Sequence, residues 1–276
     1  MRILVVGSLG YIGSETFLQL TQDFSVTGID IRDGTSYQSL SREMVATFDS
    51  VIWLAGHSSV KSSEEDPIGA LKNNLSDLYE FALKIPQNSK FICASSASVY
   101  GNSAPNISEE TDNLPPSINI YDRTKKWFEE LIPDLHSQPY MLRFGTVSGW
   151  SPRMRRDLIV NAMTLDALDS GVVKVRNGSR YRSVLGIGDL ISAIRTILLE
   201  DVPSGTYNVA SQSGSIDEIG SRVAAKLGAQ VSRSGESDSG SGGYSFRLST
   251  QKLESLTSWR PTLTIEDIVS SIKDRV

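Results

Sequence analysis

The chain of 276 residues is long enough to bury a substantial core, as one large domain or as a domain with a smaller lobe. Hydrophobic residues at 39% and charged residues at 21% are typical of an ordinary soluble globular protein, and a formal net charge of -5 argues against a general nucleic-acid-binding surface. The lone cysteine, Cys93, excludes an intramolecular disulfide and favours a reducing compartment such as the cytoplasm. We expect no signal peptide, membrane span or metal site.

Apolar runs alternate with amphipathic stretches, which predicts an α/β fold built on a doubly wound parallel sheet. In chain order, we expect strands at 3–6, 26–30, 51–55, 91–94 and 140–144, with helices at 13–22, 39–48, 67–85 and 121–131. The later chain is less regular. There we expect helices at 158–169, 189–199 and 216–227, strands at 172–175 and 207–210, a loop at 232–243, and two short helices within 249–276.

A glycine-rich turn, with Gly7, Gly10 and Gly13, follows the first expected strand and precedes the first expected helix. A dinucleotide fingerprint requires that context, because glycines permit a tight turn and the amino terminus of a helix attracts a pyrophosphate. The spacing is G-x-x-G-x-x-G, and a plain glycine turn is the alternative interpretation. Asp30 ends the second expected strand, where an acid binds the adenosine ribose hydroxyls and repels a 2'-phosphate, so NAD is favoured over NADP. Arg32 points the other way, since it can pair with that phosphate.

Tyr121 and Lys125 stand four residues apart and therefore share one face of an expected helix. A nearby cation favours the phenolate, so we expect Lys125 to lower the tyrosine pKa from its ordinary value of about 10 toward the range useful for a general acid/base. Together with the glycine turn, this pair indicates a cofactor-dependent redox enzyme.

At this point the sequence resembles the extended short-chain dehydrogenase/reductase superfamily, in its NAD-dependent nucleotide-sugar epimerase/dehydratase branch. The resemblance runs nearly end to end and rests on the shared order of short motifs: GSLGYIG at 7–13, WLAG at 53–56, NN at 73–74, SSASVYG at 95–101, YDRTK at 121–125, LRFGTV at 142–147, YNV at 207–209 and WRP at 259–261. It implies a Rossmann domain over residues 1–150, to which 183–210 return, and a smaller substrate-binding lobe formed by 151–182 and 211–276.

The resemblance implies that Ser96, Tyr121 and Lys125 are the catalytic residues. Tyr121 would exchange the proton of a sugar hydroxyl while NAD takes the attached hydride. Lys125 would lower the tyrosine pKa and hold the nicotinamide ribose, and Ser96 would hydrogen-bond the same sugar oxygen. From the residues alone, Ser95, Ser96 and Ser98 are equal candidates.

The resemblance also implies contacts to the two ligands. Contacts to NAD come from the glycine turn, the ends of strands and the catalytic helix: Gly7, Gly10, Tyr11, Ile12, Gly13, Asp30, Ile31, Arg32, Leu54, Ala55, Gly56, Ser58, Asn73, Tyr121, Lys125 and Phe144. A nucleotide-diphosphate sugar needs cations or amides for its diphosphate, and the implied substrate contacts are Ser96, Thr146, Arg153, Asn161 and Arg182. The alternative for the three arginines within 153–156 is a solvated basic loop.

The sequence departs from the family pattern in several places. Only 20 residues separate Asp30 from Val51, enough for roughly one helix, whereas relatives fit a further strand there that cradles the adenine. We expect that strand to be lost. Gly186, Trp53, Ser148 and Trp150 also replace usual family residues, and the short chain predicts a trimmed substrate lobe.

Ala97 and Ser98 follow Ser96 at the place where sugar dehydratases carry an Asp-Glu pair, so we reject dehydration and expect epimerisation at a hydroxyl-bearing carbon. A ketosugar reductase and a uronic-acid decarboxylase use the same triad, and the decarboxylase would need a further carboxylate such as Glu65 or Glu109. A non-catalytic dinucleotide-sensing protein is the third alternative, against which the complete triad argues. By resemblance, the helices at 67–85 and 121–131 pair into a four-helix homodimer interface.

Overall fold

The computed structural model of the protein describes residues 1–108, 110, 114–235 and 244–276. Its centre is a six-stranded sheet in which neighbouring strands run parallel, in the order β10-β6-β4-β3-β1-β2. These strands are β1 (Arg2–Val6), β2 (Ser25–Ile29), β3 (Ser50–Trp53), β4 (Lys90–Ser96), β6 (Pro139–Phe144) and β10 (Gly205–Val209). The apolar runs predicted these strands because a parallel sheet is buried on both faces.

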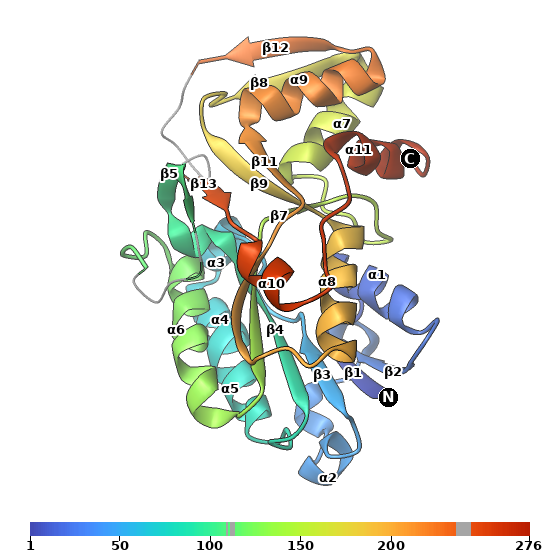
Figure 1. Ribbon diagram of the computed structural model, residues 1–276, viewed down its shortest axis with the longest axis vertical. Helices are drawn as coiled ribbons and strands as arrows, with labels where there is room; N and C mark the ends of the chain where they lie inside the picture. Colours follow the sequence, from blue (N-terminus) through green and yellow to red (C-terminus); the bar gives the residue numbers. More distant parts are fainter. Residues whose placement is uncertain (109, 111–113, 236–243) are drawn as a thin grey trace.

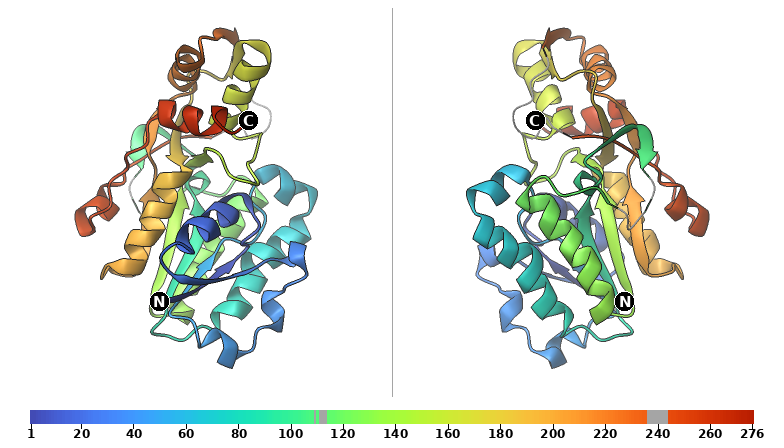
Figure 2. Two further views of the ribbon diagram at one scale, coloured as in Figure 1. Left: turned by 90° about the vertical axis from the view of Figure 1, so that its right-hand side faces the viewer. Right: turned by 90° about the vertical axis from the view of Figure 1, so that its left-hand side faces the viewer.

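Helices cover both faces of this sheet, so the predicted doubly wound fold is confirmed (Figures 1 and 2). On one face lie α1 (Tyr11–Leu20) and α8 (Ile187–Leu199), which pack on strand residues such as Ile3 and Val5. On the other face, Leu4 and Val6 pack in the core formed with α5 (Asp77–Ala82) and α6 (Ile120–Leu135). Successive residues of one strand thus enter two different cores, as strand geometry requires.

The expected helix at 67–85 is one helical rod with an irregular middle. It runs through α4 (Pro67–Leu71), a π-helical turn at Lys72–Ser76 and α5. Asp66 caps α4, with its carboxylate accepting the Gly69 amide at 2.9 Å, and Pro67 occupies the first turn. An additional helix, α3 (Val60–Glu65), precedes it and was not predicted.

The chain between β2 and β3 has no strand, as the short spacing predicted; the structure describes every residue of this stretch. It forms two 3-10 turns, Ile31–Asp33 and Tyr37–Ser39, and α2 (Arg42–Val45), so the helix expected at 39–48 is only four residues long. An aromatic cluster lies here, with the Tyr37 ring 5.1 Å from the Trp53 ring and 6.0 Å from the Phe81 ring. Strand β2 is therefore the edge of the sheet, and aromatic side chains fill the adjoining core.

A smaller lobe lies above the carboxyl ends of the sheet strands (Figure 1). It holds the two-stranded sheet of β8 (Val172–Arg176) and β12 (Gln230–Ser234) and the three-stranded sheet of β7 (Thr146–Ser148), β9 (Tyr181–Gly186) and β11 (Gln212–Ser215). Its helices α7 (Ile159–Ser170), α9 (Ile216–Leu227) and α11 (Ile265–Lys273) share one core with β8. Part of the loop expected at 232–243 belongs to β12, and 236–243 lie outside the described residues.

Two segments connect the lobe to the sheet domain. Strand β13 (Ser245–Leu248) pairs in parallel with β5 (Asn102–Ser108), and α10 (Gln251–Leu256) packs beside β10. Residues after 211 therefore contribute to both parts of the molecule. The predicted domain boundaries at 150, 182 and 210 stay predictions. Within the described part of the chain, each helix is too short or too polar to cross a membrane.

Candidate active site

The glycine turn closes over the carboxyl end of β1 and leads directly into α1. Gly7 has a φ of +87°, and a Cβ added there would lie 2.7 Å from the Ala55 nitrogen. A Cβ on Gly13 would lie only 1.9 Å from the Gly7 carbonyl oxygen, so both positions require glycine. Gly10 precedes α1 and offers no side-chain cap, which leaves the first-turn amides for an anion. The turn therefore fits a pyrophosphate.

Asp30 at the end of β2 binds the glycine turn from the side. Its carboxylate is buried and accepts the Leu9 amide and the Arg32 amide, each at 3.0 Å. The Arg32 guanidinium donates to the Leu9 carbonyl at 2.7 Å. Each carboxylate oxygen accepts one of these bonds and has further lone pairs, so Asp30 retains the capacity to bind ribose hydroxyls. Ile31 beside it is exposed.

The loop after β3 lies on the other side of the turn and includes Gly56 and Ser58, with Leu54 and Ala55 half-buried at its start. Gly56 has a φ of +127°, and a Cβ there would lie 2.3 Å from the Asn74 side-chain oxygen. Asn74 donates to the His57 carbonyl and to Thr124 of α6, both at 3.2 Å. Asn73 has its amide nitrogen 3.3 Å from His57 Nδ1, and its contact to the cofactor stays a prediction. The π-helical turn thus connects this loop to the helix that holds Lys125.

Ser96, Tyr121 and Lys125 lie at the carboxyl end of β4 and on the first turns of α6. Ser96 ends β4 and donates to the Ser98 hydroxyl at 3.0 Å. Ser96 pairs in register with Phe144 at the end of β6. Lys125 donates to the Ala94 carbonyl of β4 at 2.8 Å, and its ammonium lies 5.7 Å from the centre of the Tyr121 ring. The two strand ends and the helix therefore place these three residues together.

The electrostatics of Tyr121 correct one expectation. Burial raises the Tyr121 pKa, Asp122 raises it further, and Ser96 and Arg155 act to lower it. Lys125 was expected to lower the Tyr121 pKa, but its ammonium points to a main-chain carbonyl and to the ring. Burial also lowers the pKa of Lys125 itself to about 8. Desolvation acts on both groups and favours their neutral forms.

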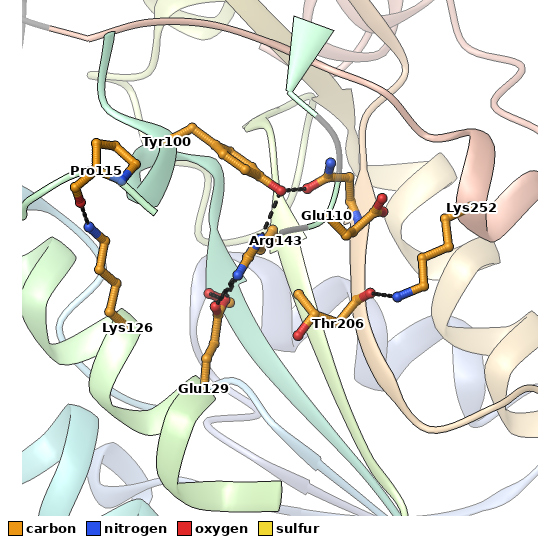
Figure 3. A network of polar contacts seen from close by, with 10 residues as sticks. Tyr100, Glu110, Pro115, Lys126, Glu129, Arg143, Thr206 and Lys252 are labelled. Carbon is orange, nitrogen blue, oxygen red and sulfur yellow. Dashed lines mark hydrogen bonds and ion pairs between the residues drawn. The ribbon is translucent and has the colours of Figure 1, made fainter. Parts of the chain in front are cut away.

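A buried ion pair joins Glu129 of α6 to Arg143 of β6 (Figure 3). Glu129, one helical turn after Lys125, accepts from Arg143 of β6 through Nε at 3.1 Å and a terminal nitrogen at 2.6 Å. Ser95 of β4 also donates to Glu129. Arg143 donates to the Tyr100 hydroxyl at 2.9 Å, which in turn donates to an Asn208 side-chain oxygen. The pair fixes α6 against β4 and β6, and sequence reasoning did not identify it.

Arg155 crosses from the smaller lobe to the sheet domain. It donates to the Ser58 carbonyl at 2.7 Å, pairs with Asp157 at 2.5 Å, and acts on the Tyr121 pKa. Arg153, chosen from the same cluster as a substrate contact, is exposed. Its contact to substrate stays a prediction, and the geometry draws attention to Arg155. A count of nearby arginines cannot show which of them reaches Ser58 in the sheet domain.

Asn161, a predicted substrate contact, is buried in the protein. The residue is 0% exposed, and its amide makes three hydrogen bonds within the chain. The oxygen accepts the Gly149 amide at 2.9 Å, and the nitrogen donates to the Tyr11 hydroxyl at 3.1 Å and to the Arg155 carbonyl at 2.8 Å. Tyr11 completes this link by donating to the Gly149 carbonyl. Asn161 therefore supports Arg155 and ties the lobe to α1, and its contact to a substrate stays a prediction.

The two remaining predicted substrate residues lie on the mixed sheet of the lobe. Thr146 begins β7 and is half-buried. Arg182 on β9 donates to the Tyr181 carbonyl at 2.9 Å and to the Tyr244 carbonyl. Burial and the neighbouring Arg180 lower the Arg182 pKa to about 10, which leaves the guanidinium charged at neutral pH. This cationic group is suited to phosphate oxygens.

Comparison with known proteins agrees with this geometry. Residues 3–210 match the model of the NAD dependent epimerase/dehydratase family. A UDP-glucose 4-epimerase from Pisum sativum is 27% identical over 78% of this chain and 77% of its own length. A UDP-glucose 4-epimerase from Bacillus subtilis is 28% identical, and that match spans 50% of this chain and about half of the enzyme (48%). A UDP-glucuronic acid 4-epimerase from Bacillus cereus, solved with UDP-glucuronic acid and NAD, shares the fold with a TM-score of 0.82 at 21% identity, covering 99% and 98% of the two chains.

Proposed function

Because the chain belongs to the NAD-dependent epimerase/dehydratase family, we propose that it epimerises a nucleotide-diphosphate sugar with NAD as its cofactor. One observation carries the proposal: Ser96, Tyr121 and Lys125 lie at the same edge of the parallel sheet as the glycine turn. In open α/β sheets, ligands bind outside the carboxyl ends of the strands. The UDP-sugar 4-epimerases among the relatives support a uridine nucleotide and carbon 4 as the reacting position.

The side chains have distinct tasks in this reaction. Tyr121 takes the proton of the sugar hydroxyl and later returns it, and Ser96 hydrogen-bonds the same oxygen as negative charge develops there. NAD, when bound, would supply the acceptor and donor of the hydride at the attached carbon. Lys125 would hold the nicotinamide ribose. Because burial raises the Tyr121 pKa, deprotonation of the phenol depends on Ser96 and on the positive charge of Arg155.

The residues of the sheet domain fit this cofactor. Gly7 and Gly13 allow the tight turn that leads into the uncapped start of α1, where a pyrophosphate would bind, and Asp30 offers acceptors to ribose hydroxyls. Arg32 is bound to the Leu9 carbonyl, which reduces its availability for a 2'-phosphate. These contacts favour NAD over NADP. On the substrate side, our candidates for binding the diphosphate are Arg155, which crosses from the lobe to the sheet domain, and Arg182, which stays charged at neutral pH.

The alternatives are less well supported. The curated relatives named above are epimerases, which does not favour a ketosugar reductase or a uronic-acid decarboxylase. Glu65, one carboxylate that a decarboxylase was expected to need, is exposed and lies 3.8 Å from Lys61 on the surface of α3. Residue 109, the other, lies outside the described residues. A sensing protein would not need the proton-transfer pair.

We also propose a cytoplasmic homodimer. Apolar side chains are exposed along the helical rod and α6, with Ile68 at 80%, Leu83 at 49%, and Trp127 and Leu131 at 38%. Exposed apolar patches of this kind are typical of protein interfaces. Light scattering tests this proposal, and a monomer at working concentration would contradict it.

The function is tested by incubating the protein with a panel of UDP-sugars and NAD, and reading product stereochemistry by NMR. Epimerisation gives the second stereoisomer with no net change in NAD, reduction consumes NADH, and a sensor does neither. Tyr121→Phe removes only the hydroxyl and is expected to lower turnover at least about a hundredfold. Full turnover by this variant would refute the assigned role.

A further inference from the structure

Asp122 is a buried carboxylate directly next to the catalytic tyrosine. Only 2% of the residue is exposed, on the first turn of α6. Its Oδ2 accepts from Asn119 Nδ2 at 3.0 Å and from the Tyr244 hydroxyl at 2.6 Å. Burial raises the Asp122 pKa, while the neighbouring Ser98 and the hydrogen bonds from Tyr244 and Asn119 oppose this effect. A carboxylate so placed needs these donors to remain charged.

Tyr244 reaches this carboxylate from the far end of the sequence. It immediately precedes β13, and its ring is buried in a cluster with Ala97 and Tyr100. Its carbonyl accepts from Arg182 of the substrate lobe, and its hydroxyl also accepts from Asn119. The residue therefore joins β13, the lobe and the start of α6 in one place.

The contacts of Tyr244 fix the start of the helix that carries Tyr121. Tyr244 donates to Asp122 Oδ2, and Asn119 Nδ2 donates to the same oxygen at 3.0 Å. The Asp122 amide in turn donates to Asn119 Oδ1 at 2.9 Å, and Tyr121 lies between these two residues on the first turn of α6. The position of this turn is thus set by a carboxylate that the carboxy-terminal segment holds in place.

We propose that Asp122 and Tyr244 are positioning residues for the sugar reaction: Tyr244 anchors the Asp122 carboxylate, which fixes the first turn of α6 and with it the position of Tyr121. This inference rests on the proposed function. The segment around β13 would then affect turnover directly, without itself contacting the substrate. Asp122 additionally places a negative charge beside Tyr121.

The charged and titratable groups that face this pair come from several elements. Helix α6 contributes Tyr121 and Lys126, the lobe segment contributes Arg155, and β9 contributes Arg182. Lys126 lowers the Asp122 pKa, and Arg155 opposes the effect of Asp122 on Tyr121. Replacing Asp122 with Asn removes the one negative charge among these effects on Tyr121, so the Tyr121 pKa should fall.

The test compares Tyr244→Phe with Tyr140→Phe as its matched control. Each change removes one buried hydroxyl; that of Tyr140 donates to the Val202 carbonyl at 2.8 Å, away from the site. With a UDP-sugar that the wild type epimerises, Tyr244→Phe should lower kcat about tenfold and leave KM within about twofold. Tyr140→Phe should retain wild-type kcat. Equal kcat values for the two variants would overturn the proposal.

A second readout does not depend on turnover. Carbon-13 NMR titration of labelled tyrosine, with Tyr121→Phe used to assign the signal, should give a lower Tyr121 pKa in Asp122→Asn than in wild type. In an active enzyme, the rise of kcat/KM with pH should move to lower pH in the same variant, because the base loses its proton earlier. An unchanged Tyr121 pKa overturns the proposal even if no sugar is turned over, whereas an inactive wild type with the expected pKa change overturns only the proposed function. Should Asp122→Asn fail to fold, Tyr244→Phe decides alone.

Discussion

Replacing Glu129 with Gln tests how much the buried Glu129–Arg143 ion pair contributes to the free energy of unfolding. In the wild type the side chains of Arg143 and Glu129 are 2% and 6% exposed, and the carboxylate also accepts a bond from Ser95. Glutamine has nearly the same shape but no charge, so the guanidinium would stay buried without its counter-ion. Removing one partner of a buried ion pair costs about 3–5 kcal/mol. That is a large share of a typical free energy of unfolding of about 5–15 kcal/mol.

Urea unfolding followed by circular dichroism measures this loss, provided that the m-value stays the same. Glu65→Gln is the matched control because the Lys61–Glu65 pair on α3 has side chains that are 86% and 65% exposed. Exposed pairs of this kind contribute about 0.5 kcal/mol or less. The double change Glu129→Leu with Arg143→Met should recover more than half of the loss, since it removes both charges.

A loss in Glu129→Gln within about 1 kcal/mol of that in Glu65→Gln would refute this reasoning. It would mean that water or another group compensates Arg143. The outcome also bears on catalysis, because Glu129 acts to raise the pKa of Lys125 one turn earlier on α6.

Two further substitutions have defined outcomes. Lys125→Met should abolish turnover. It should also raise the free energy of unfolding at pH 7 by up to about 3 kcal/mol, because burial lowers the Lys125 pKa from 10.5 to about 8 and the unfolded chain binds that proton more tightly. The wild type should therefore gain stability between about pH 8 and 10.5 and the variant should not; parallel urea curves across this range would contradict the reasoning. Arg155→Gln should raise KM for the UDP-sugar about tenfold, because it removes a proposed contact to the diphosphate. Arg153→Gln changes an exposed neighbour and should leave KM within about twofold. The reverse order of the two KM values would show that Arg153 is the phosphate contact.

The sheet could be read from the sequence because its strands are buried on both faces and appear as continuous apolar runs. The small strands of the lobe could not. Strand β11 has the sequence Gln212-Ser213-Gly214-Ser215, and β5 and β13 pair across more than a hundred residues. Such strands are stabilised by pairing with a partner strand, so no local sequence pattern predicts them.

Some residues of the candidate site could likewise be predicted from the sequence, and others could not. Tyr121 and Lys125 are four apart on one helix, so their shared face follows from spacing alone. Arg155 contacts Ser58 at a separation of 97 residues, and Tyr244 contacts Asp122 at a separation of 122, so only the folded chain brings these pairs together. The direction of the Tyr121 pKa was mispredicted for a related reason. Spacing reveals a neighbouring cation, but it does not reveal how deeply the phenol is buried.

The loss of a strand beside β2 explains how the adenine side of the site is built. In the absence of that strand, the residues just after β2 hold the glycine turn: Asp30 binds the Leu9 amide and Arg32 binds the Leu9 carbonyl. Thr35 closes this stretch by accepting the Asp30 amide at 2.9 Å. The same carboxylate therefore shapes the turn and is the group that we propose for binding the ribose. The short connection between β2 and β3 thus preserves the glycine turn proposed to bind the pyrophosphate. The surface that would contact the adenine is reduced to the exposed residues after Asp30.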